Sequence, residues 1–182
     1  EHPPIVDGDL WEQVQMRLAE KAPPRKRPTN DPQHAMLSKL ITDPHGRPMV
    51  PTYGSSKVKR YAYYETRKDL ARPGDAPGLR FQRGHLEQHL IGHLEDLLGD
   101  EHALRSLSGL EEASQLRTMF ATAHLLALQL RQIGKAELAL RSLVAAITIR
   151  TDCMEVVLNP APLAIESVTG LAWSIPLPHR RP

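Results

Sequence analysis

The 182-residue sequence has a single cysteine, Cys153. One cysteine excludes an intrachain disulfide and a zinc site built from cysteines, and it is compatible with a reducing cytoplasm. There is no run of eighteen apolar residues and no apolar segment at the start, so we expect neither a membrane span nor a signal peptide. The chain begins at Glu1 without a methionine, and we expect it to be an excerpt from a longer protein.

Recognised catalytic motifs are also lacking. The sequence has neither a glycine-rich phosphate-binding loop nor the Gly-x-Ser-x-Gly elbow of a hydrolase. Cys153 lies in a predicted hairpin turn without an accompanying His-Asn or His-Asp pattern, so we interpret it as a buried or incidental thiol. We therefore predict no catalytic residue and no cofactor in this chain.

Three histidines, His85, His89 and His93, recur every four residues on a predicted helix and raise the alternative of a zinc protein. The third lies about 12 Å along the helix axis from the first, so one ion cannot bind all three. Glu87 comes two residues after His85, whereas a zincin has its glutamate directly after the first histidine. Because leucines one position on form a parallel stripe, we interpret the histidines as the flank of an amphipathic helix and predict no metal site.

The net charge of +2 conceals a strong asymmetry along the chain. The number of Lys and Arg residues minus the number of Asp and Glu residues is −4 over residues 1–20, +8 over 21–72, −3 over 73–159 and +1 over 160–182. A localised basic segment is typical of a protein that binds a polyanion, because each Lys or Arg that neutralises a phosphate releases a condensed counterion. A solvated basic surface is the alternative.

Composition and periodicity divide the chain into three parts. Residues 1–22 contain a capped amphipathic helix, and residues 23–34 form a basic, proline-rich linker. Residues 35–182 form one domain that begins with thin β-ribbons, which need helices to pack on. The predicted fold class is α+β, a helix-rich domain packed against small antiparallel β-ribbons, with no metal.

Within the third part, residues 36–41 and 47–53 read as two strands joined by a tight turn, and a second turn at 54–56 leads into another strand. The longest predicted helix covers residues 110–134, and its alanine-rich stripe favours a buried intramolecular helix over a coiled-coil seam. The remaining expected elements are a helical region at 84–146 overall, a β-hairpin at 147–158 and a strand within 171–177. The apolar stripe of the longest helix consists of Ala113, Leu116, Phe120, Ala123, Ala127 and Leu130.

Residues 48–68 combine five basic residues with four tyrosines around a Gly-Ser turn. The basic side chains can lie along the rim of this hairpin, and the tyrosines offer hydroxyl groups and flat faces for sugar and base contacts. Alternatively Tyr61 and Tyr63, which share one face, pack on the helices while only the lysines remain in water. For the basic residues at 25–27, a flexible arm laid along a groove is favoured over an inert tether.

The order of these pieces resembles the carboxy-terminal half of a large serine recombinase of the resolvase/invertase superfamily. HPPIVDGDLWEQVQMRL, residues 2–18, resembles the end of the recombinase domain, whose last helix follows a His-x-x-Ile-Val-Asp segment. Residues 37–66 resemble the zinc-ribbon domain, with a Leu-x-x-Leu start, Gly-x-x-Met after the first turn and a Tyr-x-Tyr-Tyr strand. RSLVAAITIRTDCMEVVLN and WSIPLPHRRP are similar to the family's hairpin and its Ile-Pro-x-x-x-basic end, so the similarity covers most of the chain.

The chain departs from the resembled zinc ribbon at the metal ligands. Where zinc-binding members place their first cysteine pair it has Asp43-Pro44-His45-Gly46, and where a later cysteine follows the tyrosines it has Glu65-Thr66. The resemblance therefore implies a zinc-ribbon-like domain without zinc, in which packing on the helices supplies what the metal supplies elsewhere.

The resemblance implies a carboxy-terminal module that binds double-stranded DNA at an attachment site. In that family a separate amino-terminal domain carries the nucleophilic serine, so this chain would cut nothing while its parent exchanges DNA strands through a phosphoserine link. The parent would be cytoplasmic, bacterial or phage-derived, and would self-associate. The predicted DNA contacts are Arg25, Lys26, Arg27, Lys57, Lys59, Arg60, Tyr61, Arg67 and Lys68. The rival hypothesis is a helical protein–protein interaction module that dimerises through residues 84–134 without binding DNA.

Overall fold

The computed structural model describes residues 35–55, 60–70, 74–166 and 170–178, together with Trp11, Glu12, Val14 and Arg17. The chain divides into two units, Glu1–Asp31 and Pro32–Pro182. In the first unit the four described residues are helical, within the predicted helix. The predicted linker at 23–34 lies outside the described residues.

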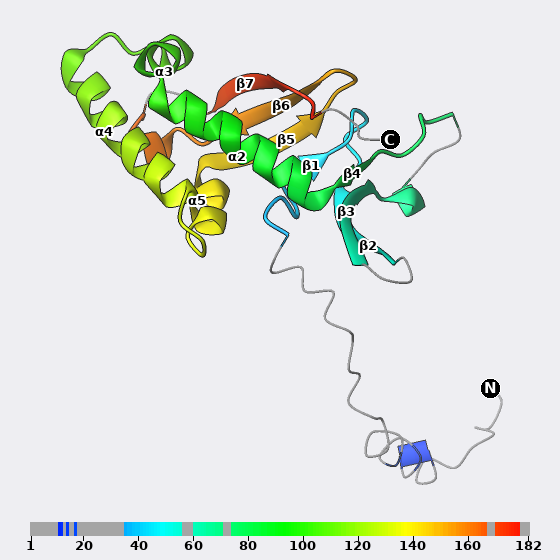
Figure 1. The fold of residues 1–182 in the computed structure, drawn as a ribbon. Coiled ribbons are helices and arrows are strands. Elements are labelled where there is room, and N and C mark those ends of the chain that lie inside the picture. The colour runs from blue at the N-terminus through cyan, green and yellow to red at the C-terminus, as the bar shows by residue number, and fades with distance from the viewer. Residues whose placement is uncertain are drawn as a thin grey trace, which may run out of the picture. The chain divides into compact units, whose positions relative to one another are not determined.

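The described part of the second unit is an α+β fold with four α-helices and two sheets, as predicted (Figure 1). Its helices form a layer against the larger sheet, and the smaller sheet lies beside the start of α2. The helices are α2 Arg83–Gly99, α3 Glu101–Ser108, α4 Ala113–Leu130 and α5 Ala136–Leu143. The strands are β1 Ile41–Thr42, β2 Met49–Ser55, β3 Arg60–Thr66, β4 Arg80–Gln82, β5 Val144–Ile149, β6 Cys153–Leu158 and β7 Leu171–Pro176, and short 3-10 turns lie at η2 Lys68–Leu70 and η3 Ala161–Leu163.

The larger sheet has the strand order β1-β5-β6-β7, in which β1 runs parallel to β5 and the other pairs are antiparallel. Alternate side chains of β6, from Met154 to Leu158, are buried, and those between them face solvent. The stripe of α2 that contains Leu86, Leu90 and Leu94 is fully buried in the same core. The predicted leucine stripe therefore forms the contact between this helix and the rest of the domain.

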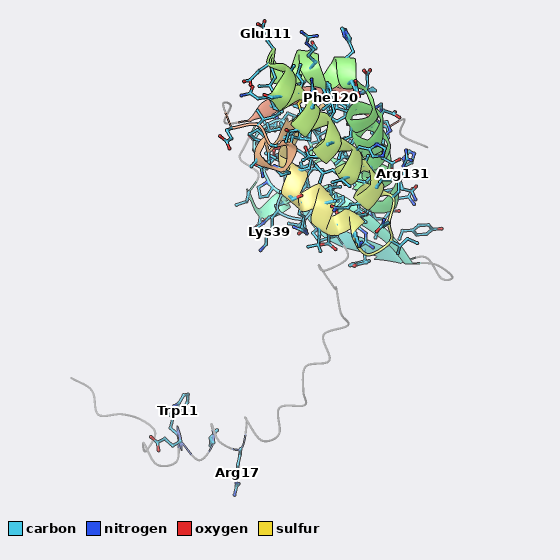
Figure 2. All side chains as sticks on the ribbon, turned by 90° about the vertical axis from the view of Figure 1, so that its left-hand side faces the viewer. Trp11, Arg17, Lys39, Glu111, Phe120 and Arg131 are labelled. Carbon is cyan, nitrogen blue, oxygen red and sulfur yellow. The ribbon has the colours of Figure 1, made fainter. Side chains whose placement is uncertain are left out.

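Helix α4 packs on α2 within the same chain, and Figure 2 looks onto it between the labels of Glu111 and Arg131. The predicted stripe lies on the side of α4 that meets the core: Ala123 and Leu130 are buried, and three of its other four members pack against the core. Met119 and Leu126 also lie in the core and were not predicted. The pattern alone could not locate the centre of the buried side, because apolar residues also occupy the opposite side of this helix.

The first predicted strand, at 36–41, is wrong over most of its length. Residues 36–40 form turns, with the Leu40 amide donating to the Leu37 carbonyl and Lys39 at a φ of 70°. Only Ile41 and Thr42 are extended, and they pair with β5. The predicted turn after them is present, with Gly46 at a φ of 76°, but the antiparallel pairing across it is a single bridge between Thr42 and Pro48. Leu37 and Ile41 are both buried, and a spacing of four residues puts two side chains on one face in a strand as well as in a helical turn, so the sequence pattern could not separate the two.

The other boundaries differ from the predictions by a few residues, and two short elements were not predicted. Helix α5 ends at Leu143, so the hairpin begins three residues before its predicted start, because the Val144 backbone is already extended at φ −100° and ψ 118°. Helix α3 is capped by Asp100, the residue before it, whose carboxylate accepts from the amides of His102 and Ala103. Strand β4 was also missed.

Among the described residues no helix is long and apolar enough to cross a lipid bilayer.

Candidate nucleic-acid interface

The smaller sheet, of order β2-β3-β4, has two faces with different roles. Registers Pro51↔Tyr64 and Tyr64↔Phe81 place these three residues on one face, where Tyr64 and Phe81 are buried. The neighbouring positions along each strand point to the other face, which we call the outer face. Its described residues are Val50, Thr52, Gly54, Tyr61, Tyr63, Glu65, Arg80 and Gln82.

A buried hydrogen-bond network ties the inner face to α2. The Tyr64 hydroxyl donates to Glu87 Oε1 at 2.6 Å and accepts from the Leu37 amide at 3.0 Å. The same Glu87 oxygen accepts from the Met36 amide at 2.9 Å. Burial raises the pKa of Glu87, and burial together with the adjacent carboxylate raises the pKa of Tyr64, so the tyrosine remains a donor. This network fixes the sheet on the body of the domain.

Tyr64 is thus the tyrosine that packs on the helices, and Tyr61 and Tyr63 lie on the other face. Tyr61 is 40% exposed. On β4, Gln82 is exposed opposite Tyr63 and Arg80 is exposed opposite Glu65, and Tyr63 is half-buried between β4 and β2. The alternative that Tyr61 and Tyr63 pack on the helices is therefore wrong.

An arginine lies on a tyrosine ring at the centre of the outer face. The Arg80 Cζ atom is 3.9 Å from the centroid of the Tyr63 ring. A Cβ added to Gly54 would be 3.1 Å from Arg80 Nη2 and 3.3 Å from Tyr63 Cε2. The guanidinium therefore extends from β4 across β3 to β2 and ends over the one residue that has no side chain. Cation–π attraction favours this arrangement.

A second arginine–tyrosine pair lies where β4 leads into α2. Arg83 Nη1 donates to the Tyr53 hydroxyl at 3.3 Å, and its Cζ is 5.8 Å from the Tyr53 ring centroid. Helix α2 starts here without a side-chain cap from Gln82 and without an acidic residue in its first turn. The positive end of the helix dipole therefore adds to the basic character of this end of the sheet.

The predicted DNA contacts separate into two groups along β3. Arg60 and Tyr61 lie at its start, whereas Arg67 and Lys68 follow its end, about 20 Å away at about 3.3 Å per residue. Arg67 is exposed, but its guanidinium pairs with Asp69, and this pairing lowers the pKa of Asp69 and raises that of Arg67. The side chains of Arg60 and Lys68 are not described. The remaining predicted contacts, Arg25, Lys26, Arg27, Lys57 and Lys59, lie outside the described residues.

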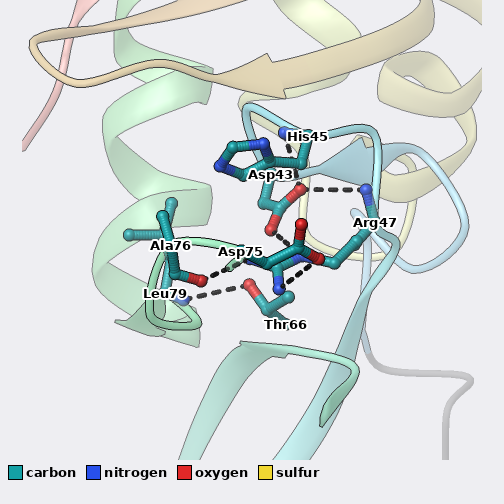
Figure 3. Close-up of polar contacts among 7 residues, drawn as sticks. All are labelled: Asp43, His45, Arg47, Thr66, Asp75, Ala76 and Leu79. Atoms are coloured by element: carbon teal, nitrogen blue, oxygen red, sulfur yellow. Dashed lines mark hydrogen bonds and ion pairs between the residues drawn. The ribbon is translucent and has the colours of Figure 1, made fainter. Parts of the chain in front are cut away.

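A buried ion pair occupies the turn that the resemblance aligns with the first zinc ligands (Figure 3). Asp43 Oδ1 accepts from the backbone amides of His45 and Arg47, both at 2.9 Å, and Oδ2 lies 2.6 Å from Arg47 Nε. Burial alone would raise the pKa of Asp43, but the hydrogen bonds from Arg47 and His45 outweigh it and lower that pKa. The carboxylate thus holds the turn in its ionised form.

The Arg47 guanidinium also reaches the segment between η2 and β4. Its Nη2 donates to the Ala76 carbonyl at 3.0 Å, and Nη1 is 3.4 Å from Asp75 Oδ2. Beside it, Thr66 Oγ1 accepts from the Leu79 amide at 3.0 Å (Figure 3). The two positions at which the resemblance expects metal ligands are therefore joined to one segment, residues 75–79, by polar contacts. We call these contacts the Arg47 cross-link.

The structure offers no metal cluster among the residues it describes: no group of three or more His, Cys, Asp or Glu side chains is placed to hold an ion. On α2 the rings of His89 and His93 are 4.6 Å apart, and His93 also meets the edge of Trp173 on β7. His89 Nε2 is 2.8 Å from the Pro176 carbonyl oxygen. These histidines therefore lie along the contact between α2 and β7.

Arg80, Tyr63 and Gly54 form the centre of the outer face. The sequence had indicated the tyrosine but not Arg80, and it had placed Gly54 in a turn at 54–56, whereas Gly54 and Ser55 are paired residues of β2. The signal that could have revealed Arg80 is the alternation in Arg80-Phe81-Gln82, one apolar residue between two polar ones, next to the ribbon. Three residues are too few to distinguish a strand from a loop.

In comparisons with known proteins, no family model matches the chain, no curated protein matches it, and no solved structure matches it.

Proposed function

We propose that this chain is the DNA-binding module of a site-specific serine recombinase and that the outer face of the smaller sheet contacts the DNA. The observation that carries the proposal is the composition of that face: Tyr61, Arg80 and Gln82 are exposed on a sheet whose other face is anchored in the core. The surrounding segment, residues 21–72, has an excess of eight basic residues.

The chemistry of this face suits a nucleic acid. Arginine binds phosphate oxygens through several N–H groups, and tyrosine hydroxyls and glutamine amides are common partners of phosphates and sugars. The major groove of DNA admits a two-stranded β-ribbon, and β2 and β3 have this form where they extend beyond the short strand β4. The resemblance supports an attachment site as the target, with strand exchange carried out by a serine domain that lies elsewhere in the parent protein.

The test is a titration of a mixed-sequence duplex at salt concentrations between about 50 and 200 mM. The triple variant Lys57→Glu, Lys59→Glu, Arg60→Glu is expected to lose affinity and to lower the salt slope by about 0.9 per phosphate contact removed. The matched control makes the same change of charge at three exposed residues of the helical region, Arg105→Glu, Arg117→Glu and Lys135→Glu. Equal affinities and slopes for the two variants would contradict a DNA contact by this hairpin.

A second candidate function rests on an apolar surface opposite the buried stripe of α4. Leu125 is 58% exposed and Leu128 is 43% exposed, and Ile133 and Leu138 are exposed beyond the end of this helix. Exposed leucines on one helix face are typical of a docking surface for another protein. Dimerisation here would make the mass in sedimentation equilibrium rise with concentration, and Leu125→Lys with Leu128→Lys would abolish that rise.

A further inference from the structure

Gly54 has an unusual role in the smaller sheet. Glycine weakens a strand interior unless another group approaches the backbone closely, and here Arg80 and Tyr63 make that approach. Gly54 does not have a positive φ, so the reason for a glycine is the space above it rather than its backbone conformation. Any side chain here would meet Nη2 of the guanidinium.

We propose that Arg80, held over the Tyr63 ring and over Gly54, is a preorganised binding group for a phosphodiester of bound DNA. This inference rests on the function proposed above and assigns a contact that neither the charge pattern nor the resemblance had indicated. The group consists of one residue from each of the three strands, so the complete sheet is needed to form it.

The geometry leaves the guanidinium available for a ligand. The Arg80 Cζ atom lies 3.9 Å from the Tyr63 ring centroid, while the Arg80 side chain as a whole remains exposed. An arginine that is already held against a ring has less conformational freedom to lose when it binds, and its planar fork matches two phosphate oxygens. A lysine would keep the charge but would lose both the stacking and the fork.

The experiment uses two duplexes of unrelated sequence and four variants of the full chain. Arg80→Ala is expected to weaken binding of both duplexes about tenfold and to lower the salt slope by about 0.9. Arg80→Lys is expected to keep the slope and still lose several-fold in affinity. Gly54→Ala changes no charge, yet it is expected to lose affinity, by less than Arg80→Lys, because the new Cβ lies 3.1 Å from Nη2 and makes the guanidinium shift by a few tenths of an ångström.

The glycine control is Gly92→Ala, at an exposed position of α2 where a Cβ would meet nothing within 4 Å, and it is expected to bind as the unchanged chain does. Thermal unfolding checks that each variant is folded. If Gly54→Ala does not fold, Arg80→Lys still tests the same contact. Wild-type affinity with Arg80→Ala and Arg80→Lys would overturn the inference and leave the proposed function standing. A loss confined to one duplex would indicate base reading and would also overturn it. If the unchanged chain binds neither duplex, the proposed function fails together with the inference.

Discussion

The Arg47 cross-link makes a prediction about what stabilises the smaller sheet. In Arg47→Met the aliphatic stem stays, but the Asp43 carboxylate, which is 0% exposed, loses its guanidinium partner. Breaking a buried ion pair from one side costs about 3–5 kcal/mol. Because two backbone amides still donate to Asp43, we expect the lower value, about 3 kcal/mol, in the free energy of unfolding. For a domain of this size the melting temperature should fall by about 6–12 °C.

A second substitution separates the ion pair from general damage at this site. In Asp43→Asn with Arg47→Met the asparagine oxygen can still accept from both amides, and no buried charge is left unpaired. The double variant should therefore be more stable than Arg47→Met alone, within about 1–2 kcal/mol of the unchanged chain. The exposed pair Arg150–Glu155 is the matched control, and Arg150→Met there should cost less than about 1 kcal/mol.

The pH dependence of the free energy of unfolding tests the same ion pair. The pKa of Asp43 is lowered in the fold, so its contribution is full above its unfolded pKa of about 3.9 and is lost as the pH falls through the lowered value. Without the Arg47 guanidinium only the two amides oppose burial, so the pKa of Asp43 should be higher in the variant than in the unchanged chain, and protonation in acid should cost the variant less. The difference between the unchanged chain and Arg47→Met should shrink from pH 7 to pH 4 in urea unfolding. A loss below 1 kcal/mol at pH 7, or a double variant no more stable than Arg47→Met, would refute this reasoning.

Two further predictions concern the core. Because the pKa of Glu87 is raised in the fold, its contribution to the free energy of unfolding is full below its unfolded pKa of about 4.3 and is lost as the pH rises through the folded value. In urea unfolding the unchanged chain should therefore lose stability relative to Glu87→Gln between pH 4 and pH 7. A difference that stays constant over this range would contradict the prediction. Leu126→Ala should cost about 2–5 kcal/mol, because Leu126 is 8% exposed, whereas Leu125→Ala should change stability by less than about 0.5 kcal/mol. Equal losses in thermal unfolding would show that the wrong face of α4 had been assigned to the core.

The sequence predicted best what depends on local periodicity. The stripe of Leu86, Leu90 and Leu94 and the strand at 171–176 follow from patterns of a few residues, and both occur. The stripe of α4 was predicted on the correct side but without Met119 and Leu126, because leucines at 125 and 128 are as apolar as the leucine at 126 and hydrophobicity alone does not locate the centre of the buried side.

Long-range contacts could not be predicted from the sequence. Tyr64 and Glu87 are 23 residues apart, and nothing near Glu87 distinguishes it from an exposed helix glutamate. The outer face likewise depends on β4, whose three residues place Arg80 beside Tyr63 only after the sheet has formed. The basic segment was visible in the sequence, but the position of its charges relative to the tyrosines was not.

The parallel pairing of β1 with β5 has a consequence for how the chain is synthesised. Thr42 and Thr148 are 106 residues apart, and the whole smaller sheet is made between them. At about 5–20 residues per second, β1 waits about 5–20 s for its partner strand to be translated. During that interval the tyrosines and arginines of β2, β3 and β4 are already outside the ribosome while the body that anchors them is incomplete. A polyanion that met the nascent chain then would meet its basic segment before the larger sheet had closed.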